Sequence, residues 1–199
     1  MENRNDVQYV VMDMNPHFRD AALTCFPHAK IVIDRFHVTR QVIWALENVR
    51  KAEQKALSKE WRKFCKHSKR LLCKNKKDLK PDELEKLRII LGLSTRIELA
   101  YDLKNDFLEF MHSTDSKSAR ERLGLWLFHA ETSNLSEFKS CITTMHNWSM
   151  YIFNSFDVPY SNGFTEGCNN KTKVLKRVCF GIRNFSTFRN RILHCASCS

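Results

Sequence analysis

The first forty residues combine two short apolar runs with one helical pattern. The runs VQYVVM at Val7–Met12 and KIVI at Lys30–Ile33 are rich in β-branched residues, and each ends at an aspartate, Asp13 or Asp34. Residues 18–26 between them have helical spacing, and a proline follows. Nearly continuous apolar strands joined by a helix favour a buried parallel pair. Both aspartates would then emerge at the carboxyl edge of the sheet, where α/β proteins bind ligands.

From Val38 to Ser149 the pattern is helical, and no strand signal interrupts it. Apolar residues recur at the spacing of one helix face, as in Val42, Leu46 and Val49. A stripe of this kind is far more often core than a cofactor site. Within this region, residues 62–80 contain nine Lys or Arg and one acid. Such a charge run favours a solvated helix face, with a phosphate-contacting helix as the alternative.

The last fifth of the chain places one carboxylate, Glu166, among seven Lys and Arg residues. A helix over about residues 165–178 would place several polar and charged positions on one face at intervals of three, four and seven. These positions are Glu166, Asn169 or Asn170, Lys173 and Arg177. We expect a turn around Gly181, then a last helix over residues 186–193 that is capped by Ser186.

The charge composition favours a polyanionic partner. The 199 residues carry a formal net charge of +11, and clustered cations gain free energy by releasing counterions from nucleic-acid phosphates. A basic surface kept for solubility is the alternative, but the concentration of charge near the C-terminus favours binding. The candidate DNA-binding residues are Lys171, Lys173, Lys176, Arg177, Arg183 and Arg189.

Eight cysteines and the absence of a long apolar run indicate a reducing, cytoplasmic location with no membrane insertion. In a DNA-binding bacterial protein this location is the nucleoid. The chain is long enough to bury a substantial core.

Asp13, Asp34 and Glu166 have the layout of a carboxylate site for Mg2+ or Mn2+. Such a site suits phosphodiester cleavage, because two ions can activate a nucleophile and stabilise the leaving oxygen. For Asp13 or Asp34 taken singly, a helix cap or turn is the better interpretation. The three acids together favour the metal site.

Three stretches resemble the DDE transposases of the insertion-sequence family ISL-three, which have a ribonuclease H-like catalytic core. They are VVMDMNPHFRDAALTCFPHAKIVIDRFHV from Val10, AYDLKNDF from Ala100, and SNGFTEGCNNKTKVLKRVCFGIRNFSTFRNRIL from Ser161. The resemblance implies that Asp13 is the second catalytic aspartate and Glu166 the catalytic glutamate. It also implies that Asp34 and His37 form a supporting D-x-x-H signature. Asn169 and Asn170 would support the glutamate or a phosphate, as their helical spacing indicates.

The resemblance implies a fold in three parts. Residues 1–40 would form a partial ribonuclease H-like core of two parallel strands, residues 41–155 a large all-α insertion between the second Asp and the Glu, and residues 156–199 the basic remainder of the core. The family's first catalytic aspartate belongs on a strand upstream of the stretch that opens this chain. We therefore expect the chain to be the carboxyl-terminal part of a transposase that binds Mg2+ or Mn2+ only weakly and is inactive alone.

Three functions remain open at this point. The first is the remainder of a transposase that cleaves and joins DNA at terminal inverted repeats and target DNA. The second is a non-catalytic protein that binds DNA through its basic C-terminal helix, or that pairs with and regulates a full-length transposase. The partner could also be another copy of the chain in a homo-oligomer. The third is a structural RNA-binding protein. Metal-dependent cleavage of DNA distinguishes the first two.

Overall fold

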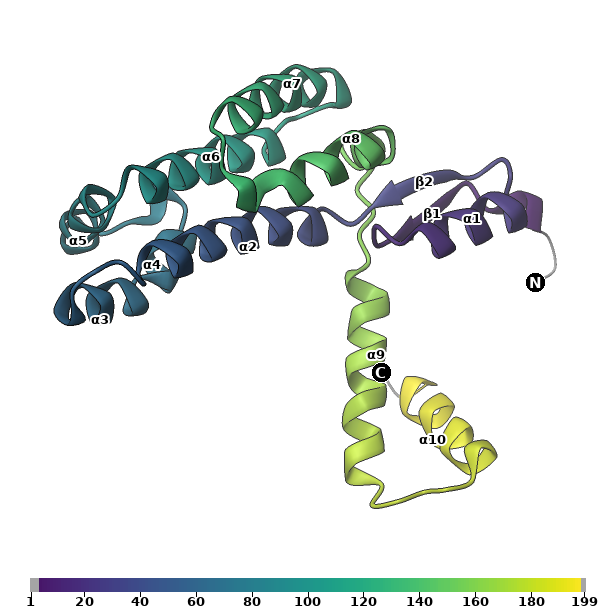
Figure 1. Ribbon diagram of the computed structural model, residues 1–199. Coiled ribbons are helices and arrows are strands. Elements are labelled where there is room, and N and C mark those ends of the chain that lie inside the picture. Colours follow the sequence, from purple (N-terminus) through teal and green to yellow (C-terminus); the bar gives the residue numbers. More distant parts are fainter. Residues whose placement is uncertain (1–3, 198–199) are drawn as a thin grey trace. The chain divides into compact units, whose positions relative to one another are not determined.

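The computed structural model describes residues 4–197 and divides between Tyr160 and Ser161 into two compact units. Each unit is described by itself (Figure 1). The first contains η1 (Arg4–Asp6), β1 (Tyr9–Met12), α1 (Pro16–Cys25), β2 (Lys30–Ile33), α2 (Arg35–Glu53), α3 (Lys59–His67), α4 (Lys69–Cys73), η2 (Lys76–Asp78), α5 (Pro81–Gly92), α6 (Thr95–Met111), α7 (Ser116–Thr132), η3 (Ser136–Phe138) and α8 (Lys139–Asn154). The second contains α9 (Gly163–Val178) and α10 (Phe185–Ser197).

The two strands are parallel, as the sequence predicts. Tyr9 pairs with Lys30 and Met12 with Ile33, and α1 forms the crossover. Asn15 caps α1 by accepting a hydrogen bond from the His17 backbone N–H at 2.9 Å. The register brings the ends of the two strands side by side, so residues 13 and 34 leave the sheet at the same edge.

Helix α2 begins directly at the end of β2. Its long apolar stripe is buried, with Val38, Val42, Leu46 and Val49 at most 1% exposed. The first turn of α2 therefore lies at the sheet edge, and the rest of the same helix is packed in the core. Residues near this turn are held by packing along the whole helix.

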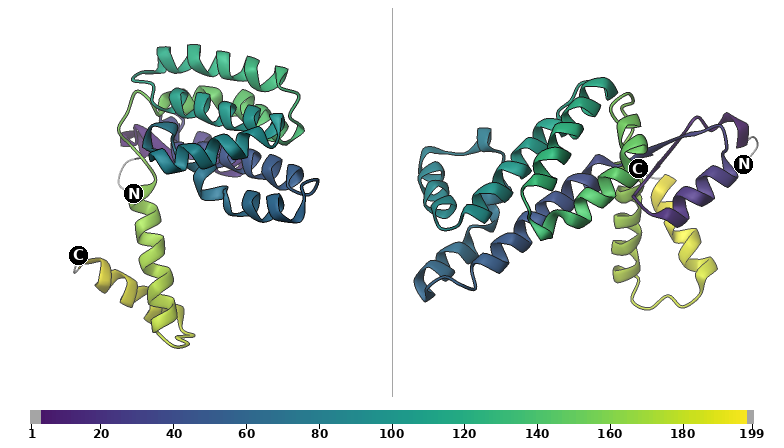
Figure 2. Two further views of the ribbon diagram at one scale, coloured as in Figure 1. Left: turned by 90° about the vertical axis from the view of Figure 1, so that its left-hand side faces the viewer. Right: turned by 45° about the horizontal axis from the view of Figure 1, so that its top comes forward.

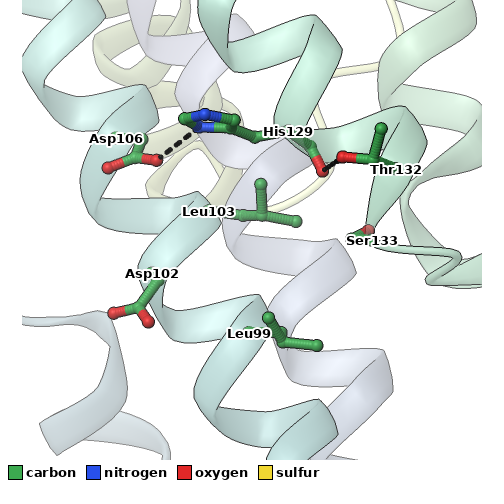
Figure 3. A pocket seen from close by; sticks show the side chains of 7 residues that line it. All are labelled: Leu99, Asp102, Leu103, Asp106, His129, Thr132 and Ser133. Atoms are coloured by element: carbon green, nitrogen blue, oxygen red, sulfur yellow. Dashed lines mark hydrogen bonds and ion pairs between the residues drawn. The ribbon is translucent and has the colours of Figure 1, made fainter.

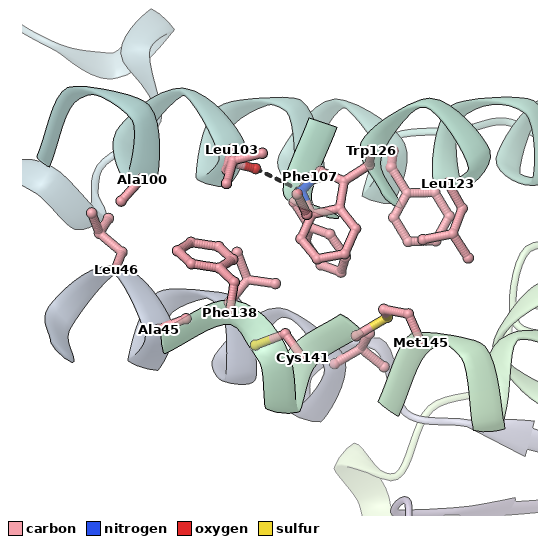
Figure 4. Close-up of a cluster of buried hydrophobic side chains, with 14 of the residues drawn as sticks. Ala45, Leu46, Ala100, Leu103, Phe107, Leu123, Trp126, Phe138, Cys141 and Met145 are labelled. Carbon is pink, nitrogen blue, oxygen red and sulfur yellow. Dashed lines mark hydrogen bonds between the residues drawn. The ribbon is translucent and has the colours of Figure 1, made fainter. Parts of the chain in front are cut away.

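The core of the first unit is helical (Figure 4). Trp126 of α7 lies against Phe107 of α6 with ring centroids 4.9 Å apart, and its indole N–H donates to the Leu103 carbonyl at 2.8 Å. Phe138 and Met145 are fully buried in the same cluster. The apolar pattern from Val38 to Ser149 is thus core, as predicted, and no strand is found there among the described residues.

One long-range hydrogen bond connects the end of the helical region to the sheet. The Asn154 side-chain amide, at the end of α8, donates to the Ile31 carbonyl of β2 at 2.8 Å. Helix α8 also packs on β2. Helix α8 therefore holds the strand pair through its packing on β2 and through the Asn154 hydrogen bond. This keeps the sheet edge in a defined place.

The second unit is a helical hairpin, seen from two further directions in Figure 2. The turn between α9 and α10 occurs at Phe180 and Gly181, which have φ of 39° and 89°. Gly181 suits this left-handed conformation because it lacks a Cβ. The prediction that Ser186 caps α10 is wrong, since Asn184 accepts from the Thr187 backbone N–H at 3.2 Å and the helix begins at Phe185.

The architecture is mostly helical with one pair of parallel strands, which is consistent with the predicted α/β class. The ribonuclease H-like core and the division at residues 40 and 155 stay predictions. None of the helices in residues 4–197 is both long and apolar enough to span a membrane.

Candidate functional site

The carboxyl edge of the strand pair holds two aspartates in different environments. Asp34 is 7% exposed and caps α2, because its Oδ1 accepts from the Phe36 backbone N–H at 2.9 Å. The helix-cap interpretation therefore holds for Asp34, whereas the cap of α1 is Asn15 and not Asp13.

Asp13 lies close to a histidine from the neighbouring helix. His37 Nδ1 lies 3.2 Å from Asp13 Oδ1, and the two side chains are 22% and 41% exposed. The spacing Asp34-x-x-His37 explains this geometry. Asp34 starts α2, and His37 follows one turn later on the side of the helix that lies toward β1. The edge of the sheet thus combines two carboxylates and one imidazole on closely anchored backbone.

This donor set fits a divalent cation in its chemistry. Carboxylate oxygens are the preferred ligands of Mg2+ and Mn2+, and an imidazole nitrogen is acceptable to Mn2+. Asp13 is partly exposed, so a ligand can reach it from solvent. Asp34 already directs one oxygen to its own helix cap, which makes it better suited to support than to sole coordination.

In the second unit, Glu166 lies in the first turn of α9. Because α9 is continuous from Gly163 to Val178, Glu166, Asn169, Asn170, Lys173 and Arg177 fall within an arc of about 100° on its surface, as predicted. The structure does not bring every predicted DNA-binding residue to this face. Lys176 is at its flank and Lys171 on another side, while Arg183 lies in the turn and Arg189 on α10.

The basic side chains of this hairpin are exposed, and no residue of α9 is buried. An acid at the N-terminus and Lys176 and Arg177 in the last turn complement the helix dipole. The charge therefore stabilises the helix and remains open to a phosphate partner. Leu175, on the side of α9 opposite to Glu166, and Phe188 of α10 are half-buried.

The helical region has a separate pocket between α6 and α7 (Figure 3). Asp106 Oδ2 lies 3.2 Å from His129 Nδ1, and Asp102 lies one turn earlier on α6. Burial raises the pKa of Asp102, and the charges of Glu98 and Asp106 add to this rise. Asp102, Leu103 and Asp106 belong to the AYDLKNDF stretch that resembles the family, but none of the lining residues is a predicted site residue. The acidic character of the pocket disfavours nucleic-acid phosphates there.

Two residues were missed in the sequence. Asn154, which ties α8 to β2, gives no signal because an amide at a helix end is common. Lys59 lies just outside the basic run that begins at Arg62, but it shares a helix face with that run. Its spacing of three from Arg62 and four from Lys63 would have identified it.

Comparisons with known proteins agree on one class. The family model DDE_Tnp_ISL3, described as "Transposase", matches residues 1–192. The transposase for insertion sequence element IS1001 of Bordetella parapertussis is 25% identical over 186 residues, 92% of this chain and 46% of that protein. The transposase for insertion sequence element IS1557 of Mycobacterium tuberculosis is 27% identical over 113 residues, 57% of this chain and 25% of that protein.

A protein named "ATP-dependent protease" from Lactococcus lactis subsp. lactis is 32% identical over 109 residues, 53% of this chain and 32% of that protein. The chain thus spans less than half the length of each of these curated relatives. No solved structure matches it significantly. With a parallel strand pair that ends in two acids, a basic late helix that begins with a glutamate, and a family match over residues 1–192, the chain belongs to the ISL-three family of transposases.

Proposed function

We propose that this chain supplies Asp13 and Glu166 as two carboxylates of the catalytic centre of a DNA transposase. The whole protein would cleave DNA at the ends of a mobile element and join the freed 3′ hydroxyl to target DNA. The observation that carries the proposal is the 3.2 Å approach of His37 Nδ1 to Asp13 Oδ1 at the carboxyl edge of the parallel strands. This edge is where α/β proteins bind ligands, and the chain belongs to a transposase family.

In this proposal the residues of the chain position the reactants. Asp13 and Glu166 would hold Mg2+ or Mn2+, which stabilises the charge that develops on phosphate oxygens. His37 Nδ1 would fix the orientation of the Asp13 carboxylate, and Asp34 would support His37 by starting the helix that carries it. Asn169 or Asn170 would orient Glu166 or a phosphate. Lys173, Lys176 and Arg177 would guide the DNA backbone.

Two carboxylates clamp two ions poorly, so we propose that the chain binds the metal weakly and does not cleave DNA by itself. A third carboxylate would come from a further strand of a ribonuclease H-like core, of which β1 and β2 would form part. Residues 4–197 would thus provide two of the three carboxylates of the site.

Cleavage of a duplex that carries the element's terminal inverted repeats tests the assignment. In a transposase that contains these residues and the third acid, Asp13→Asn and Glu166→Gln should each reduce Mg2+-dependent cleavage by at least about a thousandfold, because each removes a ligand. Asp78→Asn and Glu121→Gln are matched controls on exposed positions. Full cleavage by the Asp13→Asn protein would overturn the role of Asp13, and cleavage by the present chain alone would overturn its proposed inactivity.

A second candidate is a DNA-binding or regulatory protein that uses the basic face of α9 without chemistry. The exposure of the whole helix favours it, since nothing in the second unit covers Lys173 or Arg177. Metal-free DNA binding that is unchanged by Glu166→Gln but weakened by the pair Lys173→Gln and Arg177→Gln would support this function. Equal binding by both variants would exclude the face as a DNA contact.

A further inference from the structure

Helix α3 presents a compact basic face that the proposed catalytic site does not use. Lys59, Arg62, Lys63 and Lys66 are all exposed and fall within an arc of about 100° of the helix surface. The opposite side carries Cys65, which is fully buried, and Phe64, which packs against the core. The cations therefore point away from the body of the first unit.

Among the described residues, some exposed cations of the first unit have a carboxylate partner, whereas the four cations of this face, like Lys55, Lys69 and Arg88, have none. Four other exposed cations each face a carboxylate: Lys51 with Glu47, Lys77 with Glu109, Lys86 with Asp82, and Arg122 with Glu109. Like charges at spacings of three and four repel each other, so the α3 face is a local source of unfavourable energy.

The backbone beneath this face is held rigidly. Arg50 and Glu47 of α2 form a buried bidentate pair, at 2.8 Å and 2.7 Å. The same guanidinium donates to the Cys65 carbonyl of α3 at 3.0 Å, and the Ser68 hydroxyl donates to that carbonyl at 2.6 Å. Burial raises the pKa of Glu47, but the hydrogen bond and charge of Arg50, together with the charges of Lys69 and Lys51, lower it overall. A fixed helix loses little conformational entropy when its surface binds a ligand.

We infer that the α3 face is a second DNA contact, which binds the phosphate backbone of double-stranded DNA without reading its sequence. From Lys59 to Lys66 the helix rises about 10 Å, which spans roughly three phosphates of one strand. Four cations over this rise give one positive charge per roughly 3.5 Å, which matches the spacing of about 3.4 Å between phosphates along one strand of a duplex. The face carries no pattern of base-reading side chains, so the contact would add affinity equally for all sequences. The inference does not rest on the catalytic assignment of Asp13 or Glu166.

Binding of the whole chain to a random-sequence 30-base-pair duplex, without divalent metal and over a series of salt concentrations, tests this inference. The test variant replaces Lys59, Arg62, Lys63 and Lys66 by Gln. The control variant replaces Lys51, Lys77, Lys86 and Arg122 by Gln, so that both lose three lysines and one arginine. Circular dichroism melting confirms that both variants fold.

The logarithm of the DNA affinity falls as the logarithm of the salt concentration rises. In the α3 variant this decrease should be less steep than in the control by about three to four units of slope, because four cations no longer release counterions from the DNA. An equal change in both variants would show that only net charge matters and would overturn the inference. Binding of both variants to polyglutamate is measured as well. If the α3 variant binds DNA as the control does but no longer binds polyglutamate, the inference is overturned in favour of an acidic protein partner. The Lys173→Gln and Arg177→Gln protein is compared in parallel, so that failure of the α9 face and failure of the α3 face are separate results.

Discussion

The helices α6 and α9 have similar lengths, 17 and 16 residues, but α6 is buried in the core and α9 is exposed. On α6, Ala100, Leu103, Phe107 and Phe110 are at most 4% exposed and pack against α2 and α7. On α9, Val174 and Val178 are 55% and 54% exposed, and no residue is buried. Helix α6 is therefore stabilised by burial, whereas α9 depends on its charges, its dipole and the half-buried side that faces α10.

The difference in burial between α6 and α9 reflects a difference between the two units. The helical core of the first unit has its own stability and anchors the sheet edge with Asp13 and His37. The α9–α10 hairpin carries Glu166 and exposed cations on a unit with little core. A unit of this kind gains order when a partner covers it, and phosphates match its charge. The three predictions below test this contrast, from the largest expected effect to the smallest.

Truncation of the core should have the largest effect. Trp126→Ala removes a fully buried ring, its contact with Phe107 and its hydrogen bond to Leu103, so the free energy of unfolding should fall by about 3–5 kcal/mol. Trp44, also in the first unit, is 60% exposed, and Trp44→Ala should cost less than about 1 kcal/mol. Urea denaturation followed by circular dichroism measures both. Similar losses in the two variants would contradict the burial contrast.

The buried Lys104 of α6 should make core stability depend on alkaline pH. Burial lowers the pKa of Lys104 from 10.5 to about 8, although its ammonium group donates to the Lys74 carbonyl and to Asn105. Between these pH values the unfolded chain binds a proton that the folded chain has released, so stability rises with pH. Below pH 8 the lysine is charged in both states, and the cost of burying it is complete.

The comparison with Lys104→Met isolates this group from other alkaline titrations. The free energy of unfolding of the natural chain, relative to that of the variant, should increase by about 3 kcal/mol from pH 8 to pH 10.5. Chemical denaturation at a series of pH values measures the difference. A difference that stays constant, or decreases with pH, would show that Lys104 does not titrate in this way.

The smallest effect is expected on α9. Val174→Ser and Val178→Ser remove side chains that are more than half exposed, so each should change the free energy of unfolding by less than about 0.5 kcal/mol. Backbone amides of α9 should also exchange with solvent faster than those of α6, as measured by hydrogen exchange and mass spectrometry. Protection of α9 equal to that of α6 would mean that the hairpin is stabilised by more than its own contacts.

Much of the local structure follows from the sequence. The run KIVI predicts β2 over Lys30–Ile33, and the predicted helix over residues 165–178 agrees with α9 to within two residues. The cap of α10 was misplaced, because Asn184 and Ser186 are both good capping residues two positions apart. The spacing of capping residues in the sequence does not by itself show which of them starts the helix.

The sequence by itself determined the order of strands and helices, the aspartates at two strand ends, and the basic faces, because these depend on local spacing of apolar and charged residues. The tertiary structure decided that His37 lies close to Asp13, since this contact needs the parallel register and the direction of α2. It also decided that α6 is buried and α9 is exposed, because burial depends on which surfaces meet and an amphipathic pattern does not specify its partner.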